Sequence, residues 1–189
     1  MWHNVSMDPL LIIGIAVLIV LTLLWLNYNH LITLRERIKE ALSTIEVQLK
    51  RRADLIPNLV ESVKGYAKHE KDLLENVTKA RSELVRAGTL QQKAAADNQI
   101  SEALKSIFAV AEGYPDLKAN QNFLELQQEL SDTENKISYA RQFYNSNVLA
   151  YNIAIKTFPG IIFANMFHFN ESELFAATDE EKKEIKIKF

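Results

Sequence analysis

Residues 10–26 read LLIIGIAVLIVLTLLWL, a run that contains no charged side chain. A helix over this run is about 25 Å long, because each residue adds about 1.5 Å, and this is close to the minimum for crossing a bilayer. Trp2 flanks the run on one side, and Trp25 and Tyr28 flank it on the other. Such rings prefer the interface between lipid and water. The run therefore predicts a transmembrane helix over residues 10–27 that contacts the lipid bilayer.

A cleaved signal peptide is the competing interpretation of this segment. Signal peptides begin with positive charge and end at a small-residue cleavage site. Residues 1–9 carry no Lys or Arg, and Asn27-Tyr28-Asn29-His30-Leu31 offers no small-x-small pattern. We therefore expect an uncleaved anchor with residues 1–9 as a short external tail. Because Arg35, Arg37 and Lys39 follow the anchor, the positive-inside bias predicts a cytoplasmic C-terminal domain.

The composition of the 189 residues leaves room for this anchor and one further domain. Only five Gly and four Pro residues interrupt the chain, which favours long helices. The absence of cysteine excludes disulfides, thiol catalysis and thiolate metal sites. A net charge of −2 provides no general attraction to nucleic acid, so we predict no nucleic-acid partner.

A long apolar stripe follows the anchor. Apolar residues recur at alternating steps of three and four from Leu31 to Val77, as on one face of a helix. Pro57 lies inside this run, where proline ordinarily kinks or ends a helix. The apolar phase continues through it without a glycine turn, so a kink in one helix is favoured. A break at Asp54, with Pro57 opening a new helix, is the alternative.

Two punctuation points divide the next part of the chain. Gly88 has the position of a C-cap glycine, and Thr89 with Gln92 has capping-box spacing. One helix is therefore expected to end there and another to begin. The second helix is expected to end at Gly113-Tyr114-Pro115.

The last long helix repeats apolar residues at the same alternating spacing from Phe123 to Phe158, and Pro159-Gly160 ends it. Long helices joined by short connections run antiparallel and bury their apolar stripes against one another. We therefore predict an all-α fold. In it, the N-terminal transmembrane helix is followed by an antiparallel, up-and-down bundle of long helices over residues 28–160.

Residues 161–189 lie beyond the predicted bundle. Their first part, IIFANMFHF at residues 161–169, is too short to span a membrane. It either covers one end of the bundle or dips into the lipid surface. Asn170 has the position of an N-cap for a short last helix through Leu174 and Phe175, before a charged tail.

The sequence shows no motif for catalysis or for cofactor binding. No Walker loop, dinucleotide fingerprint or nucleophile elbow occurs, and His69-Glu70 only begins a zinc-protease motif, since residue 73 is Leu. Basic side chains within residues 64–71 form a patch, but their acidic neighbours indicate a solvated helix face. We predict no catalytic residue, no metal and no cofactor.

Polar side chains interleave with the core stripe of the last long helix. Those at or beside core-facing positions are Arg141, Tyr144, Asn145, Tyr151 and Asn152. A buried polar group without a partner costs about 1–3 kcal/mol, so each of them needs one. We predict a polar network that fixes helix register, with partners drawn from Arg51, Arg52, Asp54, Asn58 and Glu134. A ligand site between the helices is the alternative interpretation.

The block from Arg51 to Glu70, RRADLIPNLVESVKGYAKHE, resembles the hallmark block of the LemA family. Its most specific features are Pro57-Asn58 inside a helical pattern and the Gly65-Tyr66 pair that follows. Later segments resemble the family's further motifs in the same order, so the resemblance covers nearly the whole chain. These segments are Ala80-Arg81, Tyr114-Pro115-Asp116-Leu117, Glu134 to Ile137, Ala140-Arg141, Tyr144-Asn145, Tyr151-Asn152 and Phe158-Pro159.

The resemblance implies an N-terminal anchor with a short external tail, a cytoplasmic helical bundle, a bacterial inner-membrane location and no enzyme activity. Some members of the family take part in building magnetosome membranes. With the anchor and the missing chemical motifs, it leads us to expect a non-enzymatic, membrane-anchored interaction or scaffold protein. Its partner would be a membrane protein or a second copy of the chain. A small-ligand-binding or sensory helical domain at the membrane is the alternative.

Overall fold

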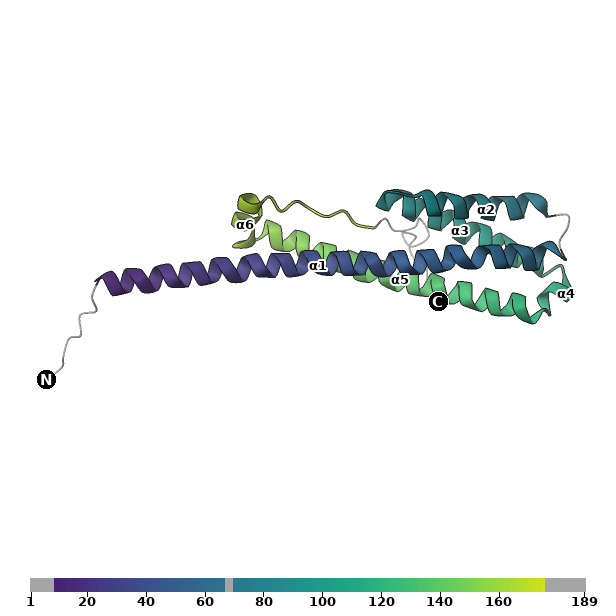
Figure 1. The fold of residues 1–189 in the computed structure, drawn as a ribbon, viewed down its shortest axis with the longest axis horizontal. Helices are drawn as coiled ribbons and strands as arrows, with labels where there is room; N and C mark the ends of the chain where they lie inside the picture. The colour runs from purple at the N-terminus through teal and green to yellow at the C-terminus, as the bar shows by residue number, and fades with distance from the viewer. Residues whose placement is uncertain (1–8, 67–69, 176–189) are drawn as a thin grey trace, which may run out of the picture. The chain divides into compact units, whose positions relative to one another are not determined.

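The computed structural model describes residues 9–66 and 70–175, and every regular element in this part of the chain is a helix (Figure 1). The all-α prediction is therefore confirmed. The helices are α1 (Pro9–Lys64), α2 (Lys71–Arg86), α3 (Leu90–Ala111), α4 (Pro115–Lys118), α5 (Gln121–Lys156) and α6 (Gly160–Phe167).

The chain divides into two compact units, which we describe separately. Of the described residues, the anchor unit contains 9–39 and 146–173, and the bundle unit contains 40–66, 70–145, 174 and 175. Helices α1 and α5 each contribute residues to both units.

The bundle unit is an up-and-down arrangement of four helical segments, from α1, α2, α3 and α5. Figure 1 shows α1 and α3 running in one direction, with α2 and α5 running in the other. Each segment buries one apolar stripe, as the spacing of apolar residues requires. In α1 this stripe includes Ile45, Leu49 and Ile56, all at most 3% exposed. The predicted antiparallel bundle is thus present in this unit.

Helix α1 continues without interruption through Pro57. The alternative in which Pro57 opens a new helix is therefore wrong. The predicted stripe from Leu31 to Val77 is nevertheless not one helix, because α1 ends at Lys64 and α2 begins at Lys71. Lys71 lies seven residues after Lys64, which is nearly two helical turns, so the apolar phase of α2 matches that of α1 in spite of the break.

The predicted helix boundary around Gly88 is confirmed, although Gly88 does not have the left-handed backbone of a C-cap glycine. The Thr89 hydroxyl accepts a hydrogen bond from the Gln92 backbone N–H at 3.2 Å, and the Gln92 side-chain oxygen accepts one from the Thr89 N–H at 3.2 Å. This capping box satisfies two backbone donors at the start of α3. Helix α3 then ends at Ala111, before the predicted Gly-Tyr-Pro break, and the one-turn helix α4 follows.

The anchor unit begins with the apolar part of α1. This segment is long and apolar enough to cross a membrane, and none of its most apolar window is buried within the protein. Farther along, α1 and the end of α5 lie side by side and run in opposite directions (Figure 1). Their buried side chains in this unit are Leu31, Leu34, Ile38, Val148, Tyr151 and Ile155.

Helix α5 ends at Lys156, close to the predicted Pro159-Gly160 break, and the chain bends by 92° into α6. The last helix predicted to start at Asn170 is not formed. Residues 169–175 contain no helical turn, because their backbone groups bond to side chains of α5 instead of to one another. The charged tail lies outside the described residues.

Gly160 makes the corner between α5 and α6 possible. A Cβ atom at this position would lie 2.0 Å from the Ala154 carbonyl oxygen, a backbone atom that cannot rotate away. We expect Gly160→Ala to destabilise the protein by about 1–3 kcal/mol or more, as overpacking does in well-packed sites. A thermal melt of the detergent-solubilised full chain measures this change. Gly88→Ala is the control, since its nearest neighbour would be the Gln92 side chain at 3.9 Å. Equal melting temperatures for the two variants would contradict the packing argument.

Candidate functional site

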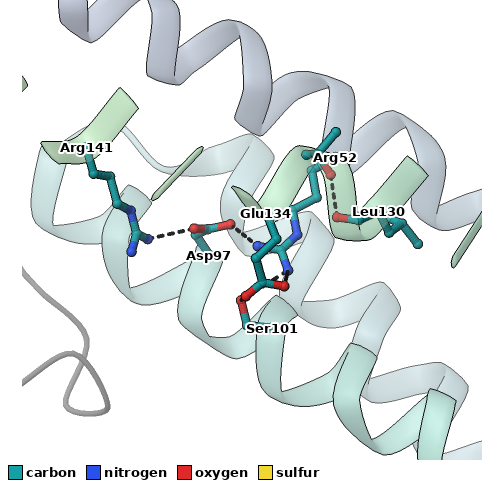
Figure 2. A network of polar contacts seen from close by, with 7 residues as sticks. Arg52, Asp97, Ser101, Leu130, Glu134 and Arg141 are labelled. Atoms are coloured by element: carbon teal, nitrogen blue, oxygen red, sulfur yellow. Dashed lines mark hydrogen bonds and ion pairs between the residues drawn. The ribbon is translucent and has the colours of Figure 1, made fainter. Parts of the chain in front are cut away.

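The centre of the bundle unit contains an ion network that is shielded from water. The Asp97 carboxylate on α3 accepts hydrogen bonds from Arg52 Nη1 at 2.7 Å and from Arg141 Nη2 at 2.6 Å, one on each oxygen. The exposed fractions of these side chains are 1% for Arg52, 3% for Asp97 and 9% for Arg141. One carboxylate therefore joins guanidinium groups from α1 and α5, as Figure 2 shows.

Glu134 on α5 completes the charge balance of the network. Its carboxylate accepts a hydrogen bond from Arg52 Nη2 at 3.0 Å and another from the Ser101 hydroxyl at 3.1 Å. The same Arg52 Nη2 also donates to the Ser101 oxygen at 3.1 Å. Two positive and two negative groups thus offset one another, and Glu134 lies at the edge with its side chain 48% exposed.

The electrostatic consequence is that each charged member depends on its partners. Removing a charge from water costs several kcal/mol, and this cost is offset in a protein only by close, well-oriented opposite charges. The Nε–H groups of Arg52 and Arg141 are also buried, and neither has an acceptor among the described residues. The network joins α1, α3 and α5, and its predicted role in fixing their register stays a prediction.

Asp97, the residue that connects the two arginines, is not among the network residues predicted from the sequence. Asp97 lies three residues after Ala94 and three before Ile100, both of which are buried on α3. The signal in the sequence is a charged residue that continues the three- and four-residue spacing of the buried apolar residues of the helix.

Three of the predicted network residues lie elsewhere. Arg51 is exposed and pairs with Glu129, because it lies one position, or about 100° of helix rotation, from Arg52. Asp54 is exposed and pairs with Lys50. Asn58 is also exposed, and its backbone carbonyl accepts a hydrogen bond from the Ser62 hydroxyl.

The family-motif pair Gly65 and Tyr66 lies at the end of α1. The Tyr66 hydroxyl accepts a hydrogen bond from the Asn120 side-chain amide at 3.2 Å. A Cβ atom at Gly65 would meet nothing within 4 Å, and its backbone is not left-handed. The structure therefore provides no steric reason for glycine at residue 65.

Helix α2 supplies the hydrogen bond that Pro57 removes from α1. Proline has no N–H, so the carbonyl of Ala53, four residues earlier, loses its partner inside the helix. The Arg81 Nε–H on α2 donates to this carbonyl at 2.8 Å. An unpaired acceptor on α1 is thus satisfied by a side chain of the neighbouring helix, which sets the position of α2 along α1.

This arrangement predicts an energetic coupling between residues 57 and 81. We expect Arg81→Met to cost about 1–3 kcal/mol, because it leaves the buried Ala53 carbonyl unsatisfied. In a Pro57→Ala background, the restored N–H supplies the missing donor, so the same change should cost at least about 0.5 kcal/mol less. A double-mutant cycle by urea titration measures the difference, and Arg86→Met on the exposed face of α2 is the control. An identical cost in both backgrounds would refute the coupling.

The Tyr144-Asn145 pair holds the start of residues 174–189 in the bundle unit. The Asn145 side-chain amide donates to the Phe175 carbonyl at 3.1 Å, and its oxygen accepts from the Phe175 N–H at 2.8 Å. The Phe175 ring contacts Tyr144 edge-on at 6.4 Å and lies 4.8 Å from the Arg141 guanidinium carbon. Asn145 thus acts on Phe175 as a neighbouring β-strand would, by pairing both backbone groups.

The Tyr151-Asn152 pair makes equivalent bonds in the anchor unit, seven residues later. The Asn152 amide group exchanges two hydrogen bonds of 2.9 Å with the backbone of Ser172. The Tyr151 hydroxyl donates to the Asn170 carbonyl at 3.0 Å. Burial raises the pKa of Tyr151 above its ordinary value of 10.0, and Arg35 opposes this shift in part. The hydroxyl is therefore protonated at neutral pH and acts as a donor.

These contacts correct the predicted partners of the polar side chains on the last long helix. The partners of Asn145, Tyr151 and Asn152 are backbone groups of residues 170–175, not side chains of residues 51–58. Residues 170–175 were predicted to form a helix, whose backbone groups would bond to one another. Partners for α5 side chains were therefore not expected among them.

Asn145→Ala tests this attachment. It leaves the N–H and the carbonyl of Phe175 without their partner, so we expect a loss of about 1–3 kcal/mol in the free energy of unfolding. Asn122→Ala removes an exposed asparagine from the same helix and should change it by less than about 0.5 kcal/mol. Urea titration of the solubilised full chain compares the two. Losses of equal size would indicate that the Asn145 bonds contribute nothing specific.

No group of three or more His, Cys, Asp or Glu side chains is placed to hold a metal ion within residues 9–66 and 70–175. The charged groups that do gather pair with one another, in the network around Asp97.

An exposed apolar helix at the N-terminus and a helical bundle with a buried ion network define a membrane-associated helical-bundle protein. Residues 41–189 match the profile of the LemA family. The chain therefore belongs to the LemA family.

Curated proteins show the same relationship over most of the chain. It is 27% identical over 181 residues to magnetosome protein MamQ of Magnetospirillum gryphiswaldense. The alignment covers 82% of this chain and 66% of MamQ, just under two thirds. Its identity to magnetosome protein MamQ 2 of Paramagnetospirillum magneticum is also 27%, over 85% of this chain and 69% of that protein. It is 28% identical to protein LemA of Metamycoplasma hominis, over 83% of this chain and 72% of that protein.

Proposed function

We propose that this protein is a non-enzymatic, membrane-anchored interaction or scaffold protein of the bacterial inner membrane. The N-terminus lies outside and the bundle in the cytoplasm. The observation that carries the proposal is an aromatic pair on the outer face of α5. Tyr139 is 72% exposed and Phe143, one helical turn later, is 57% exposed. Large aromatic side chains are enriched among the residues that dominate protein interfaces.

The internal pairing of the charged residues supports a role without catalysis. A catalytic group needs access to substrate and a poised partner. In the bundle unit, Arg52, Asp97 and Arg141 are instead buried and pair with one another across three helices. Their arrangement stabilises a rigid body, which suits a surface that presents contacts.

The membrane anchor supports an interaction role in a second way. Tethering confines the bundle to a thin layer beside the bilayer and raises its effective concentration for partners in the same membrane. A weak contact through Tyr139 and Phe143 then suffices for association. Such a partner is another membrane protein or a second copy of this chain.

The test is photocrosslinking in cells with the full chain. A photoreactive amino acid replaces Tyr139, and the control is the same substitution at Ile137, which is 2% exposed. We expect residue 139 to crosslink reproducibly to one membrane protein or to a second copy, and we expect Phe143→Glu to abolish the product. Equal crosslinking from both positions, or none from residue 139, would contradict the proposal. So would substrate turnover by the purified protein.

The orientation has its own test. A reporter that is active only in the cytoplasm, fused after Phe189, should be active, because Arg35, Arg37 and Lys39 favour retention of that flank. An export-dependent reporter at the same position should be inactive. The reverse pair of results would overturn the proposed topology.

A groove between α1 and α2 favours a second candidate function, the binding of a small anionic ligand. It encloses about 780 Å³ and is lined by Lys64, Lys71 and Lys79, with Glu75 as its acidic member. Three ammonium groups around one groove attract an anion. A concentration-dependent rise in melting temperature with inorganic phosphate or a nucleotide, lost in Lys71→Gln, would support this candidate. An unchanged melting temperature would reject anion binding, and the scaffold proposal would be the one remaining candidate.

A further inference from the structure

Helix α6 presents an apolar surface in the anchor unit. Its sequence, GIIFANMF, has Asn165 as its single polar side chain. Phe163 and Ala164 are buried against the protein, whereas the other large apolar side chains face outward. The exposed set, with Phe158 just before the helix, is Phe158, Ile161, Ile162, Met166 and Phe167, and Met166 is 60% exposed. A contiguous apolar patch of this kind marks a site of contact.

The position of α6 identifies what covers this patch. The Phe167 ring contacts the Tyr28 ring at 4.9 Å, and the Phe169 ring lies 6.1 Å from the same tyrosine. Tyr28 directly follows the apolar segment of α1 that is predicted to cross the bilayer, where aromatic side chains lie at the interface of lipid and water. The contacts with Tyr28 therefore place α6 at the depth of that interface.

The direction of α6 agrees with this position. The end of α5 runs antiparallel to α1 in this unit, and α6 bends away from α5 by 92°. A helix that is nearly perpendicular to the spanning helix lies parallel to the plane of the bilayer. With eight residues, α6 is about 12 Å long, too short to cross and suited to lying in the interface.

We infer that α6 is a second membrane-contact site, which lies in the headgroup and upper acyl layer of the leaflet that faces the bundle. Its occupant is lipid, because the patch is continuous with the lipid-contacting end of α1 through Tyr28. Ile162, Met166 and Phe167 insert into the lipid, while Phe163 and Ala164 pack on the protein. This inference rests on the anchor that the proposed function includes. A spanning helix and an interfacial helix together fix the height and tilt of the anchor unit in the membrane, which one helix alone does not.

The experiment uses the absence of cysteine from the chain. Single-cysteine variants of the full chain, Ile162→Cys and Met166→Cys, carry a nitroxide label and are reconstituted in vesicles of phosphatidylethanolamine and phosphatidylglycerol. Electron paramagnetic resonance then compares collisions with oxygen, which enters lipid, and with a soluble nickel chelate, which does not. Leu18→Cys is the control within the span, and Val47→Cys, at an exposed position of the bundle unit, is the aqueous control.

We expect the oxygen-to-nickel ratio at residues 162 and 166 to exceed that at residue 47 several-fold and to lie below that at residue 18. A nickel-accessible α6 with a lipid-buried residue 18 would overturn the inference and leave the anchor intact. Labels at 162 and 166 that are shielded from both reagents would also overturn it, since a protein would then cover the patch. Nickel access at residue 18 would instead refute the anchor itself.

Discussion

Asp97→Ala should lower the free energy of unfolding by about 3–5 kcal/mol, the expected cost of leaving buried charges without their partner. Among the described residues, Asp97 is the one anion that pairs with both Arg52 and Arg141, whose side chains are 1% and 9% exposed. Without it, both guanidinium groups lose their buried partner, and Arg52 keeps its ion pair with the half-exposed Glu134. A loss of this size is a large part of the stability of an ordinary domain, so we expect a poorly folded bundle unit.

Urea titration of the solubilised full chain, followed by circular dichroism, measures this loss. Asp54→Ala is the matched control, because Asp54 forms an exposed pair with Lys50 that is worth less than about 1 kcal/mol. Asp97→Asn keeps the shape and removes the charge, so it should resemble Asp97→Ala. A loss below 1 kcal/mol in both Asp97 variants would show that the network is not what aligns the helices.

A hydrophobic replacement of the whole network separates stability from specificity. Buried ion pairs that are replaced together by apolar side chains of similar size often leave a protein as stable or more so. A variant with Arg52→Met, Asp97→Leu and Arg141→Leu should therefore be more stable than Asp97→Ala alone. Photocrosslinking from residue 139 in this variant then tests whether partner binding depends on the network. A lost crosslink in a stable variant would mean that binding requires the helix alignment that the network fixes.

Phe175→Ala should have the second large effect, a loss of about 3–5 kcal/mol, as for other buried phenylalanines. The Phe175 side chain is 1% exposed and contacts the Tyr144 ring and the Arg141 guanidinium group. Its removal exposes the buried ion network to water from one side and eliminates the ring that residues 174–175 insert into the bundle unit.

Leu174→Ala is the control for this prediction, because Leu174 is the preceding residue and is 55% exposed. It should change the free energy of unfolding by less than about 0.5 kcal/mol. Phe175→Leu should recover part of the loss, since it fills part of the cavity without the aromatic contacts. If Phe175→Ala and Leu174→Ala have equal effects, the insertion of Phe175 contributes nothing to the stability of the bundle.

Those parts of the fold that depend on local chemistry were predictable from the sequence. The Thr89-Gln92 capping box and the Gly-Tyr-Pro break determine helix ends through groups a few residues apart, and the structure has both. The reversal after Lys64 was not predictable from apolar spacing alone. Helix α2 begins seven residues after α1 ends, which is nearly two helical turns, so the periodicity shows no change of phase.

The candidate site was predictable only in part, because its pairings join residues far apart in the chain. Arg141 was selected as a polar residue beside a core stripe, with Arg52 and Glu134 among its candidate partners, and the structure brings the three into one network. Asp97 was missed, although its place between Ala94 and Ile100 shows the same pattern. The role of Asn145 required knowledge that residues 174–175 are not helical, which local propensity does not supply.

The carbonyl of Ala53 has a consequence for how the bundle assembles. Helix α1 alone has a gap in its hydrogen-bond ladder at Pro57, and the Arg81 guanidinium of α2 fills it. The last two turns of α1 are therefore less stable before α2 docks than after it. Formation of these turns and docking of α2 become a single cooperative event, and the helical hairpin of α1 and α2 is the expected unit of early folding.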